Sequence, residues 1–409
     1  MQDKELYQQV LGLTAPWSIQ RVELNMAEQR VDIHVEHDPA AKWCCPECER
    51  SLSCYDHAEE RTWRHLDTCQ LQTHLHARIP RVKCPEHGVL RVSVPWAEPH
   101  SRFTMLFERL IIDVLQECQH VSGTQRLLGI SWDQAFGVME RAVKRGQARK
   151  EAEVVRHVGV DEKAFRKGHM YMTIVTDLER GCVEYVAEDR GIASLAGYFQ
   201  SLTADQRNGI EAVAMDMWEP YVQATLQHLP LAEEKIVFDR FHIMKHMNDA
   251  VDKVRRMEHR QLLAEGDETL KRSKYLWLYA QENVPEQQKD RFEALKDQVV
   301  QTSRAWGLKE MLRELWECGA PGWARKFFKR WYAWASRCRL KPVIKVAQMI
   351  RKRLENVISY CKHFITSGVA EGINRKIMTI KRQARGFRNK DNFKNAIYFY
   401  CGDLNLYPL

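Results

Sequence analysis

The chain has 409 residues, of which 44% are hydrophobic, and its 62 Lys and Arg residues against 54 Asp and Glu residues give a formal net charge of +8. This length and composition are typical of a globular protein with two or three domains. No stretch approaches the roughly 20 apolar residues of a membrane helix, and residues 1–17 lack the basic and apolar segments of a signal peptide. We therefore expect a cytoplasmic protein with no membrane partner and with reduced cysteines.

A short turn occurs twice in the first region, residues 1–100. Cys45-Pro-Glu-Cys48 and Cys84-Pro-Glu-His87 each offer two metal ligands separated by two residues. One such turn supplies half of a tetrahedral zinc site, and the alternation in residues 71–83 predicts a strand that brings the two turns together. We predict a structural Zn²⁺ bound by Cys45, Cys48, Cys84 and His87. Four other residues remain alternative ligands, namely Cys44, Cys54, His57 and Cys69.

Residues 101–150 are predicted to be helical. The first helix, over 104–120, has an expected apolar face of Leu106, Leu110, Val114 and Leu115. After a short second helix, Gly129 allows a turn, and Ser131 with Gln134 forms a capping box for a third helix. The inward residues of that third helix are expected to be Trp132, Ala135, Phe136, Met139, Ala142 and Val143.

This arrangement is typical of a helix-turn-helix DNA-binding domain. A basic cluster at the end of the third helix is expected to contact DNA, through Lys144, Arg145, Arg149 and Lys150. The alternative is plain helical packing, since any two short helices can imitate the pattern.

Residues 154–240 alternate apolar, strand-like runs with turns and short helices. Asp161 ends the run VVRHVGVDE, and two further strands are expected over 169–177 and 182–188. Asp216 ends a second buried run, IEAVAMDM, before a helix. Carboxylates at the ends of buried strands are therefore candidates for one shared site.

A third acid, Glu371, lies on a predicted helix. Its expected apolar face comprises Val369, Ile373, Ile377, Ile380 and Ala384, and the adjacent stripe comprises Glu371, Asn374, Met378 and Arg382. Magnesium, or manganese in its place, prefers carboxylate, water and phosphate oxygens. Two such ions can activate the attacking oxygen and stabilise the leaving oxygen in phosphodiester transfer. We predict that Asp161, Asp216 and Glu371 are catalytic and bind this metal.

Asp239 competes with Asp216, because it also ends an apolar strand. His242 follows three residues later and is expected to hydrogen-bond the scissile phosphate or to position a catalytic acid. The alternative for His242 is a histidine at a helix start that satisfies the backbone or a neighbouring carboxylate.

The C-terminal half is basic and rich in Trp. Residues 321–353 contain no Asp or Glu, and a second basic stretch includes the expected DNA contacts Arg375, Lys376 and Arg382. A polyanionic partner is indicated, with a solvated helix face as the alternative. Five tryptophans of this half could stack on an unpaired base, but a role in the helical core is favoured for each: Trp306, Trp316, Trp323, Trp331 and Trp334.

The chain resembles the DDE transposases of bacterial insertion sequences, specifically the ISL-three group, over essentially its whole length. The segments that carry the resemblance are CPEC, CPEHG, RIPRV, VPWAEPHSRFT, GVDEKAFRKGH, VAMDMWEPY, KIVFDRFHI, RAWGLKE, AEGINRKI and ARGFRN. The resemblance implies that Asp161, Asp216 and Glu371 are the three metal-binding acids of a ribonuclease-H-like domain. It also implies that Asp239 and His242 belong to an accessory D-x-x-H element.

The expected fold is therefore a multi-domain α/β protein. A zinc-binding module (1–100) and a helix-turn-helix domain (101–150) precede a ribonuclease-H-like catalytic domain (151–409) with a helical insertion at about 256–360. The expected function is binding of the terminal inverted repeats of an insertion sequence, followed by metal-dependent DNA cleavage and strand transfer. Synapsis of two DNA ends implies a homodimer or a larger assembly.

Three alternative functions remain. The protein could be a catalytically silent or domesticated DNA-binding regulator, which would not nick end DNA. It could be another ribonuclease-H-like nuclease, which would not join pre-cleaved ends. It could also be a zinc protein without a nucleic-acid role, which the basic stretches argue against.

Overall fold

The N-terminal region folds as a sheet, as the computed structural model shows; it describes residues 3–166, 170–365 and 368–408. Helix α1 (Asp3–Val10) precedes six strands in the order β1-β2-β5-β4-β3, with β6 also paired to β5. The bounds are β1 (Trp17–Asn25), β2 (Arg30–His37), β3 (Lys42–Cys44), β4 (Ser51–Thr68), β5 (Leu71–Cys84) and β6 (Gly88–Arg91). The strand predicted over 71–83 is confirmed as β5. The core of this module includes four buried tryptophans, Trp17, Trp43, Trp63 and Trp96.

Three helices follow, α2 (Met105–Cys118), α3 (Val121–Leu128) and α4 (Trp132–Ala148). The predicted capping box of α4 is confirmed, because Ser131 and Gln134 make both reciprocal hydrogen bonds. The expected apolar face of α2 is confirmed for Leu115, which is buried, and Leu110 is partly buried against the same core. It is wrong for Leu106, which is 47% exposed, and the buried apolar side chains are Phe107, Ile111, Ile112 and Leu115. The Phe107 ring contacts that of Phe103 at 5.4 Å, which turns this stripe inward.

Trp132 also differs from its expected place in the core of α4. It is 42% exposed and stacks on Phe136 at 5.0 Å.

The central sheet has five strands in the order β11-β10-β7-β8-β9. Strands β7, β8 and β9 are antiparallel, and β10 and β11 run parallel to β7. The bounds are β7 (His157–Arg166), β8 (Met170–Asp177), β9 (Cys182–Glu188), β10 (Ala212–Met215) and β11 (Ile236–Phe238). Residue 169, the expected start of β8, lies outside the described residues.

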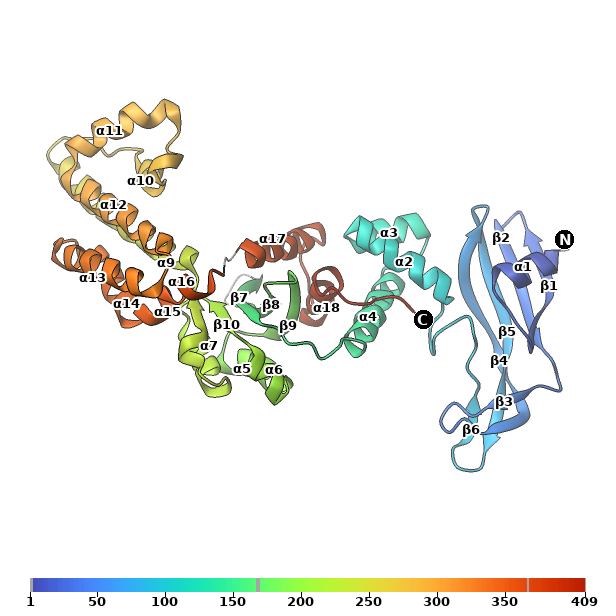
Figure 1. The fold of residues 1–409 in the computed structure, drawn as a ribbon. Helices are drawn as coiled ribbons and strands as arrows, with labels where there is room; N and C mark the ends of the chain where they lie inside the picture. Colours follow the sequence, from blue (N-terminus) through green and yellow to red (C-terminus); the bar gives the residue numbers. More distant parts are fainter. Residues whose placement is uncertain (1–2, 167–169, 366–367, 409) are drawn as a thin grey trace.

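Helices cover both faces of this sheet (Figure 1). They are α5 (Ile192–Ser201), α6 (Ala204–Gly209), α7 (Glu219–His228), α8 (Ala232–Lys235), α17 (Gly368–Gln383) and α18 (Lys390–Cys401). Leu195 of α5 and Tyr221 of α7 share a core with Val158 of the sheet. On the other face, Ile377 of α17 shares a core with Ile174 of the sheet.

The second of these cores also contains the three helices of residues 101–150. Phe107 of α2 and Phe136 of α4 belong to the same buried cluster as Ile377 and Phe393. Leu406, close to the C-terminus, is buried there as well. The helices that precede the sheet in sequence are therefore packed on the unit that carries Glu371.

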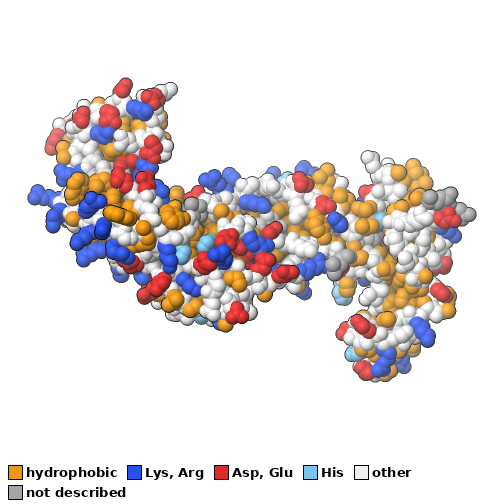
Figure 2. Space-filling view, in the orientation of Figure 1, with side chains coloured by type: hydrophobic (Ala, Val, Ile, Leu, Met, Phe, Trp, Pro, Cys, Tyr) orange, Lys and Arg blue, Asp and Glu red, His pale blue; other side chains and the backbone are white. Residues whose placement is uncertain are grey.

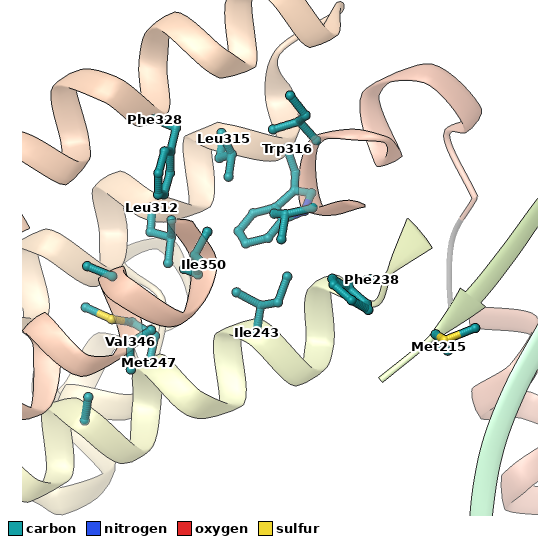
Figure 3. Close-up of a cluster of buried hydrophobic side chains, with 14 of the residues drawn as sticks. Met215, Phe238, Ile243, Met247, Leu312, Leu315, Trp316, Phe328, Val346 and Ile350 are labelled. Atoms are coloured by element: carbon teal, nitrogen blue, oxygen red, sulfur yellow. The ribbon is translucent and has the colours of Figure 1, made fainter. Parts of the chain in front are cut away.

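The described part of the chain between β11 and α17 consists of helices joined by turns, as expected. Its elements are α9 (Arg240–Ala264), α10 (Lys274–Leu278), η1 (Gln281–Asn283), η2 (Glu286–Gln288), α11 (Lys289–Gln298), α12 (Val300–Arg313), η3 (Glu314–Glu317), α13 (Pro321–Arg337), α14 (Lys341–Lys352), α15 (Leu354–Ile358) and α16 (Tyr360–His363). Figure 3 shows how α9 joins this region to the sheet: Ile243 and Met247 lie in one apolar cluster with Leu312, Trp316 and Ile350. Within the described residues, no helix has the length and apolar character needed to cross a membrane.

The five tryptophans of this region divide into two groups. Trp306, Trp316 and Trp331 are buried, as the favoured interpretation predicted. Trp323 and Trp334, both on α13, are 67% and 65% exposed, so the expectation of a core role is wrong for these two. They lie 11 residues apart on α13, on a side of the helix that its neighbours leave open.

Candidate active site and zinc centre

All four predicted catalytic residues line one cavity of about 1000 Å³. The cavity lies where the ends of β10 and β11 and the middle of β7 face α17. Asp161, Asp216, His242 and Glu371 come from four elements that are far apart in the sequence. The sheet, α9 and α17 therefore bring these residues to one place.

Asp161 lies in the middle of β7 rather than at its end, which corrects the expected position. The parallel pairing of β7 with β10 stops at Gly159, whereas its antiparallel pairing with β8 continues to Arg166. Beyond Gly159, one edge of β7 is therefore free of β10, and the Asp161 side chain faces the cavity. The apolar run of the sequence stops before Asp161, so the strand seemed to end there. Its pairing with β8 carries the strand on through the more polar residues that follow.

Both Asp161 carboxylate oxygens have partners. Oδ1 accepts the backbone N–H of Glu162 at 2.7 Å. Oδ2 lies 3.1 Å from Lys163 Nζ and accepts a hydrogen bond from the Asn374 side-chain amide. Asn374 belongs to α17, three residues after Glu371, so this bond links the helix of the third acid to the first acid.

Asp216 directly follows β10, and both of its carboxylate oxygens have partners, as those of Asp161 do. Its Oδ1 accepts the backbone N–H of Met217 at 2.6 Å, and its Oδ2 lies 3.3 Å from His242 Nδ1. The other ring nitrogen of His242 lies 3.8 Å from Asp239 Oδ2. Asp239 also caps α9, because its Oδ1 accepts the N–H of Phe241 at 2.8 Å. His242 thus stands between the preferred second acid and its competitor.

Glu371 lies in the first turn of α17, and the predicted stripe of that helix faces the cavity. Glu371, Asn374, Met378 and Arg382 all line it, whereas Ile373, Ile377 and Ile380 are buried on the other side. Two members of the expected apolar face, Val369 and Ala384, are partly or fully exposed because they lie at the helix ends. Arg375, one turn after Glu371, approaches its carboxylate to 3.6 Å.

A fourth acid, Glu162, also lines the cavity. Burial raises the pKa of Glu162, the Arg190 guanidinium opposes this rise, and the charges of Asp161 and Asp216 add to it. Its carboxylate lies 3.3 Å from Arg190 Nη1, and the Arg190 guanidinium is held between the rings of Tyr171 and Trp218. Glu162 therefore forms an ion pair with Arg190 in the lining of the cavity.

The predicted zinc ligands form a tight cluster in the N-terminal module. The ligand atoms of Cys45, Cys48, Cys84 and His87 all lie within 4.8 Å of one another. Sγ of Cys48 lies 3.7 Å from Sγ of Cys84, and Sγ of Cys84 lies 3.5 Å from Nδ1 of His87. Three thiols and an imidazole at these separations fit a four-coordinate zinc ion. Among the described residues, this is the one group of three or more such donors gathered so closely, and the three cavity acids are spread more widely.

The backbone of the two turns holds these ligands in place and contacts the Cys84 thiol. The first turn follows β3, and the second joins β5 to β6, where Gly88 adopts φ +73°. Backbone N–H groups of Glu86 and His87 lower the pKa of the Cys84 thiol to about 6. Arg50 and Glu86 connect the two turns through an ion pair of 2.8 Å.

Comparisons with known proteins agree over the whole chain. A transposase model of the ISL3 family matches residues 158–397, more than half of the chain. The chain belongs to the ISL3 family of transposases. The zinc-finger model of the IS204, IS1001, IS1096 and IS1165 transposases matches residues 41–87, and the ISL3 helix-turn-helix model matches 92–143. These matches confirm the resemblance seen in the sequence.

Two full-length relatives carry the same name. The chain is 26% identical to the transposase of insertion sequence element IS1557 from Mycobacterium tuberculosis, over 95% of this chain and 93% of the relative. It is 27% identical to the transposase of IS1001 from Bordetella parapertussis, over 96% of this chain and 97% of the relative. The protein is thus an enzyme of DNA cleavage and strand transfer with a helix-turn-helix DNA-binding domain.

Three of the four basic residues expected to contact DNA at the end of α4 make internal contacts in this transposase. The Arg145 side chain is 9% exposed and lies 2.5 Å from Glu98 and 2.7 Å from Glu108. Arg149 donates to the Tyr407 carbonyl at 2.6 Å, and Lys150 pairs with Glu184 at 2.6 Å. The Arg145 charge is therefore compensated inside the protein, which argues against a contact with DNA.

Other basic residues remain available to DNA. Lys144 on α4 is exposed, and so are Arg375, Lys376 and Arg382 on α17. Arg375 and Arg382 also line the cavity of the acids. Figure 2 shows Lys and Arg side chains gathered over the α13 and α14 end of the molecule, which matches the stretch without acids at 321–353.

Sequence reasoning missed Lys163 and Arg190 as neighbours of the acids, and it placed Asn374 beside Glu371 without predicting its hydrogen bond to Asp161. Lys163 follows Asp161 by two residues, and alternate strand residues share a face. Asn374 follows Glu371 by three residues, which places both on one helix face. These two spacings were visible in the sequence, whereas the place of Arg190 depends on how β9 leads into α5.

Asn374→Leu tests the link between α17 and Asp161. Leucine preserves the bulk but donates no hydrogen bond, so the Asp161 carboxylate should lose its fixed orientation. Loss of a group that orients a metal ligand costs about 10–100-fold in metal affinity or activity. We expect a rise of that size in the Mn²⁺ concentration giving half-maximal DNA cleavage, with end binding unchanged. Thr379→Val, on the same helix, is the matched control and should show no rise.

Proposed function

We propose that this transposase cuts and joins DNA at a divalent-metal site formed by Asp161, Asp216 and Glu371. The observation that carries the proposal is that the three acids come from β7, the end of β10 and the first turn of α17 and yet line one cavity. We also propose that the catalytic domain is ribonuclease-H-like. Its antiparallel β7-β8-β9 unit, extended by parallel β10 and β11 with helices on both faces, supports this assignment.

The residues of the cavity fit Mg²⁺ or Mn²⁺. Both ions prefer oxygen ligands, and the three acids supply carboxylates. An ammonium group and an imidazole already lie beside these carboxylates: Lys163 Nζ is 3.1 Å from Asp161, and His242 Nδ1 is 3.3 Å from Asp216. When bound, the metal would lower the pKa of the attacking water and stabilise the leaving oxygen.

The protein's own residues would bind and orient the DNA strand. Arg375 and Arg382, exposed on α17 beside the acids, are placed to contact backbone phosphates. In the first step, water attacks the scissile phosphate at the element's end. In the second, the freed 3′-hydroxyl attacks target DNA. Neither step requires a covalent bond between protein and DNA.

We propose that the zinc module and the helix-turn-helix recognise the terminal inverted repeats. Phosphate contacts position a protein on DNA, and base contacts specify the sequence. Because two ends must be brought together, the active form is proposed to be a homodimer or a larger assembly on DNA. The test of the whole proposal is incubation of the protein with the element's own end DNA and Mg²⁺, with mapping of the cut strand. Absence of cutting, with end binding intact, would favour the silent regulator.

His242→Ala should slow cleavage and leave end binding intact. His242 lies between Asp216 and Asp239 and lines the cavity, so its loss removes an orienting group and a hydrogen-bond donor to phosphate. A loss of about 10–100-fold in the single-turnover rate is expected. His246→Ala, an exposed histidine one turn later on α9, is the control. Wild-type cleavage by the His242 variant would remove this residue from the site.

Salt dependence tests the basic residues of α17. Each neutralised phosphate contributes about 0.9 to the slope of log affinity against log salt concentration. Replacing Arg375, Lys376 and Arg382 together by Gln should therefore reduce the slope by up to about 3. The matched control replaces three exposed lysines of the insertion tip, Lys271, Lys274 and Lys289. An equal loss in both variants would mean that general charge, and not this helix, binds the DNA.

A further inference from the structure

A second cluster of metal ligands lies in the N-terminal module, outside the four-residue zinc centre. We propose that His37, Cys54 and His57 bind a second Zn²⁺. His37 is the last residue of β2, and Cys54 and His57 lie in β4. None of the three belongs to the cluster of Cys45, Cys48, Cys84 and His87.

The two imidazoles face each other, at hydrogen-bond distance, through the nitrogens that would bind a metal. The three ligand atoms are more widely spread than those of the four-residue centre, so zinc would draw them together. His37 Nε2 lies 2.7 Å from His57 Nε2, and the rings are stacked with centroids 5.0 Å apart. Cys54 Sγ lies 3.9 Å from the same His57 nitrogen. Two imidazole nitrogens and a thiol are the ligand types that zinc selects.

The tautomer of His37 supports this assignment. Its Nδ1 lies 2.9 Å from the Asp38 carbonyl oxygen, and because a carbonyl only accepts, Nδ1 must carry the proton. In the neutral ring, Nε2 then accepts the Nε2–H of His57. Zinc would take the place of that proton, which would move to His57 Nδ1 through solvent. A metal-bound histidine commonly donates its other N–H to a carbonyl or carboxylate, which fixes the ring's orientation.

The sequence and the strand geometry agree with this site. Cys54-Tyr-Asp-His57 repeats the spacing of Cys84-Pro-Glu-His87. In a regular strand, residues three apart point to opposite faces. The pairing of β4 with β5 shifts register between Cys54 and Asp56 and again after His57. These irregularities let the thiol and the imidazole approach each other from one side of the strand.

The site would have a structural consequence for the module. Strand β5 lies between β2 and β4 in the sheet. A zinc ion held by His37 and His57 would therefore clamp two strands that are not hydrogen-bonded to each other. Binding releases the Cys54 thiol proton to solvent, because the thiolate is the ligand. Three protein ligands leave a fourth position for water, so this ion is expected to exchange more readily than the four-ligand one.

Zinc stoichiometry of the full-length protein tests the proposal. After equilibration with excess Zn²⁺ and gel filtration, we expect about two ions per chain for the wild type. His57→Asn and Cys54→Ser should each hold about one, and His100→Asn, an exposed histidine of the same region, should keep both. Cobalt substitution adds a second measurement: Cys54→Ser should remove part of the thiolate-to-cobalt absorption and leave the part due to the three-cysteine centre.

Two results would overturn the proposal. One is a single zinc ion per wild-type chain under saturating Zn²⁺, which would leave the His37–His57 contact as a plain hydrogen bond. The other is two ions per chain in His57→Asn with an unchanged cobalt spectrum in Cys54→Ser. Neither result bears on DNA cleavage, so the proposed function stands or falls separately.

Discussion

Asp161→Asn, Asp216→Asn and Glu371→Gln are each expected to abolish DNA cleavage while fold and end binding persist. The substitutions nearly preserve shape, but a neutral amide cannot replace a carboxylate that binds a metal. Loss of one electrostatic stabiliser of a transition state costs about 100–1000-fold in rate, and a lost metal ligand should cost at least as much. Single-turnover cleavage of labelled end DNA in Mg²⁺ measures the loss, and gel-shift titration of the same DNA measures binding.

Two neighbouring acids serve as controls for this prediction. Asp239→Asn keeps the oxygen that caps α9, since an amide oxygen accepts the Phe241 N–H equally well. Glu162→Gln loses only the charge of its pair with Arg190. If Asp216 is the second acid, Glu162→Gln should retain most of the cleavage rate, and Asp239→Asn should lose far less of it than Asp216→Asn. Full activity in Asp216→Asn together with a dead Asp239→Asn would transfer that role to Asp239.

Local patterns in the sequence predicted the secondary-structure setting of two of the proposed acids. Asp216 follows a short apolar strand, and Glu371 lies on a helix whose buried stripe, Ile373, Ile377 and Ile380, has clear helical spacing. The capping box at Ser131 was visible for the same reason. Such features depend on residues within one or two turns of each other, so a single sequence contains them completely.

What the sequence could not reveal depends on distant partners. Arg145 looked like a DNA contact because its local neighbours are basic, but the acids that neutralise it, Glu98 and Glu108, precede it by 47 and 37 residues. It also donates to the Leu406 carbonyl, 261 residues away. In the same way, the order β1-β2-β5-β4-β3 places β5 between strands that precede it in the chain. No periodicity within one segment encodes such pairings.

The helix-turn-helix and the catalytic unit share one apolar core, which changes how end recognition should be tested. Removal of residues 1–150 would strip Phe107 and Phe136 from the cluster that holds Ile377 of α17. Such a truncation would expose apolar surface beside Glu371 and confuse loss of recognition with loss of folding. Point variants of exposed residues, such as Lys144→Gln, leave that core intact and are the better probe.

Loss of zinc from the four-ligand centre should abolish the choice of end DNA. Metal binding in small zinc modules contributes about 10–16 kcal/mol of apparent free energy at neutral pH, much of which is folding energy. Cys45 is fully buried in the N-terminal module, so Cys45→Ser should leave the 41–87 segment without its closing constraint. The expected result is loss of preference for end DNA over random duplex, with general DNA binding retained through α17 and the insertion.

Metal analysis and acid titration check this prediction. Cys69→Ser, which replaces an exposed cysteine outside the cluster, should keep both its zinc and its end preference. Because the pKa of the Cys84 thiol is about 6, this ligand is a thiolate at neutral pH and gains a proton as pH falls below that value. Zinc affinity, measured by competition with a chromophoric chelator, should therefore fall more steeply with falling pH below about pH 6, where Cys84 also carries a proton. Above that pH the Cys48 thiol, whose pKa is raised, still loses its proton to solvent when zinc binds. Normal end preference in a Cys45→Ser protein without zinc would show that the module does not read the repeats.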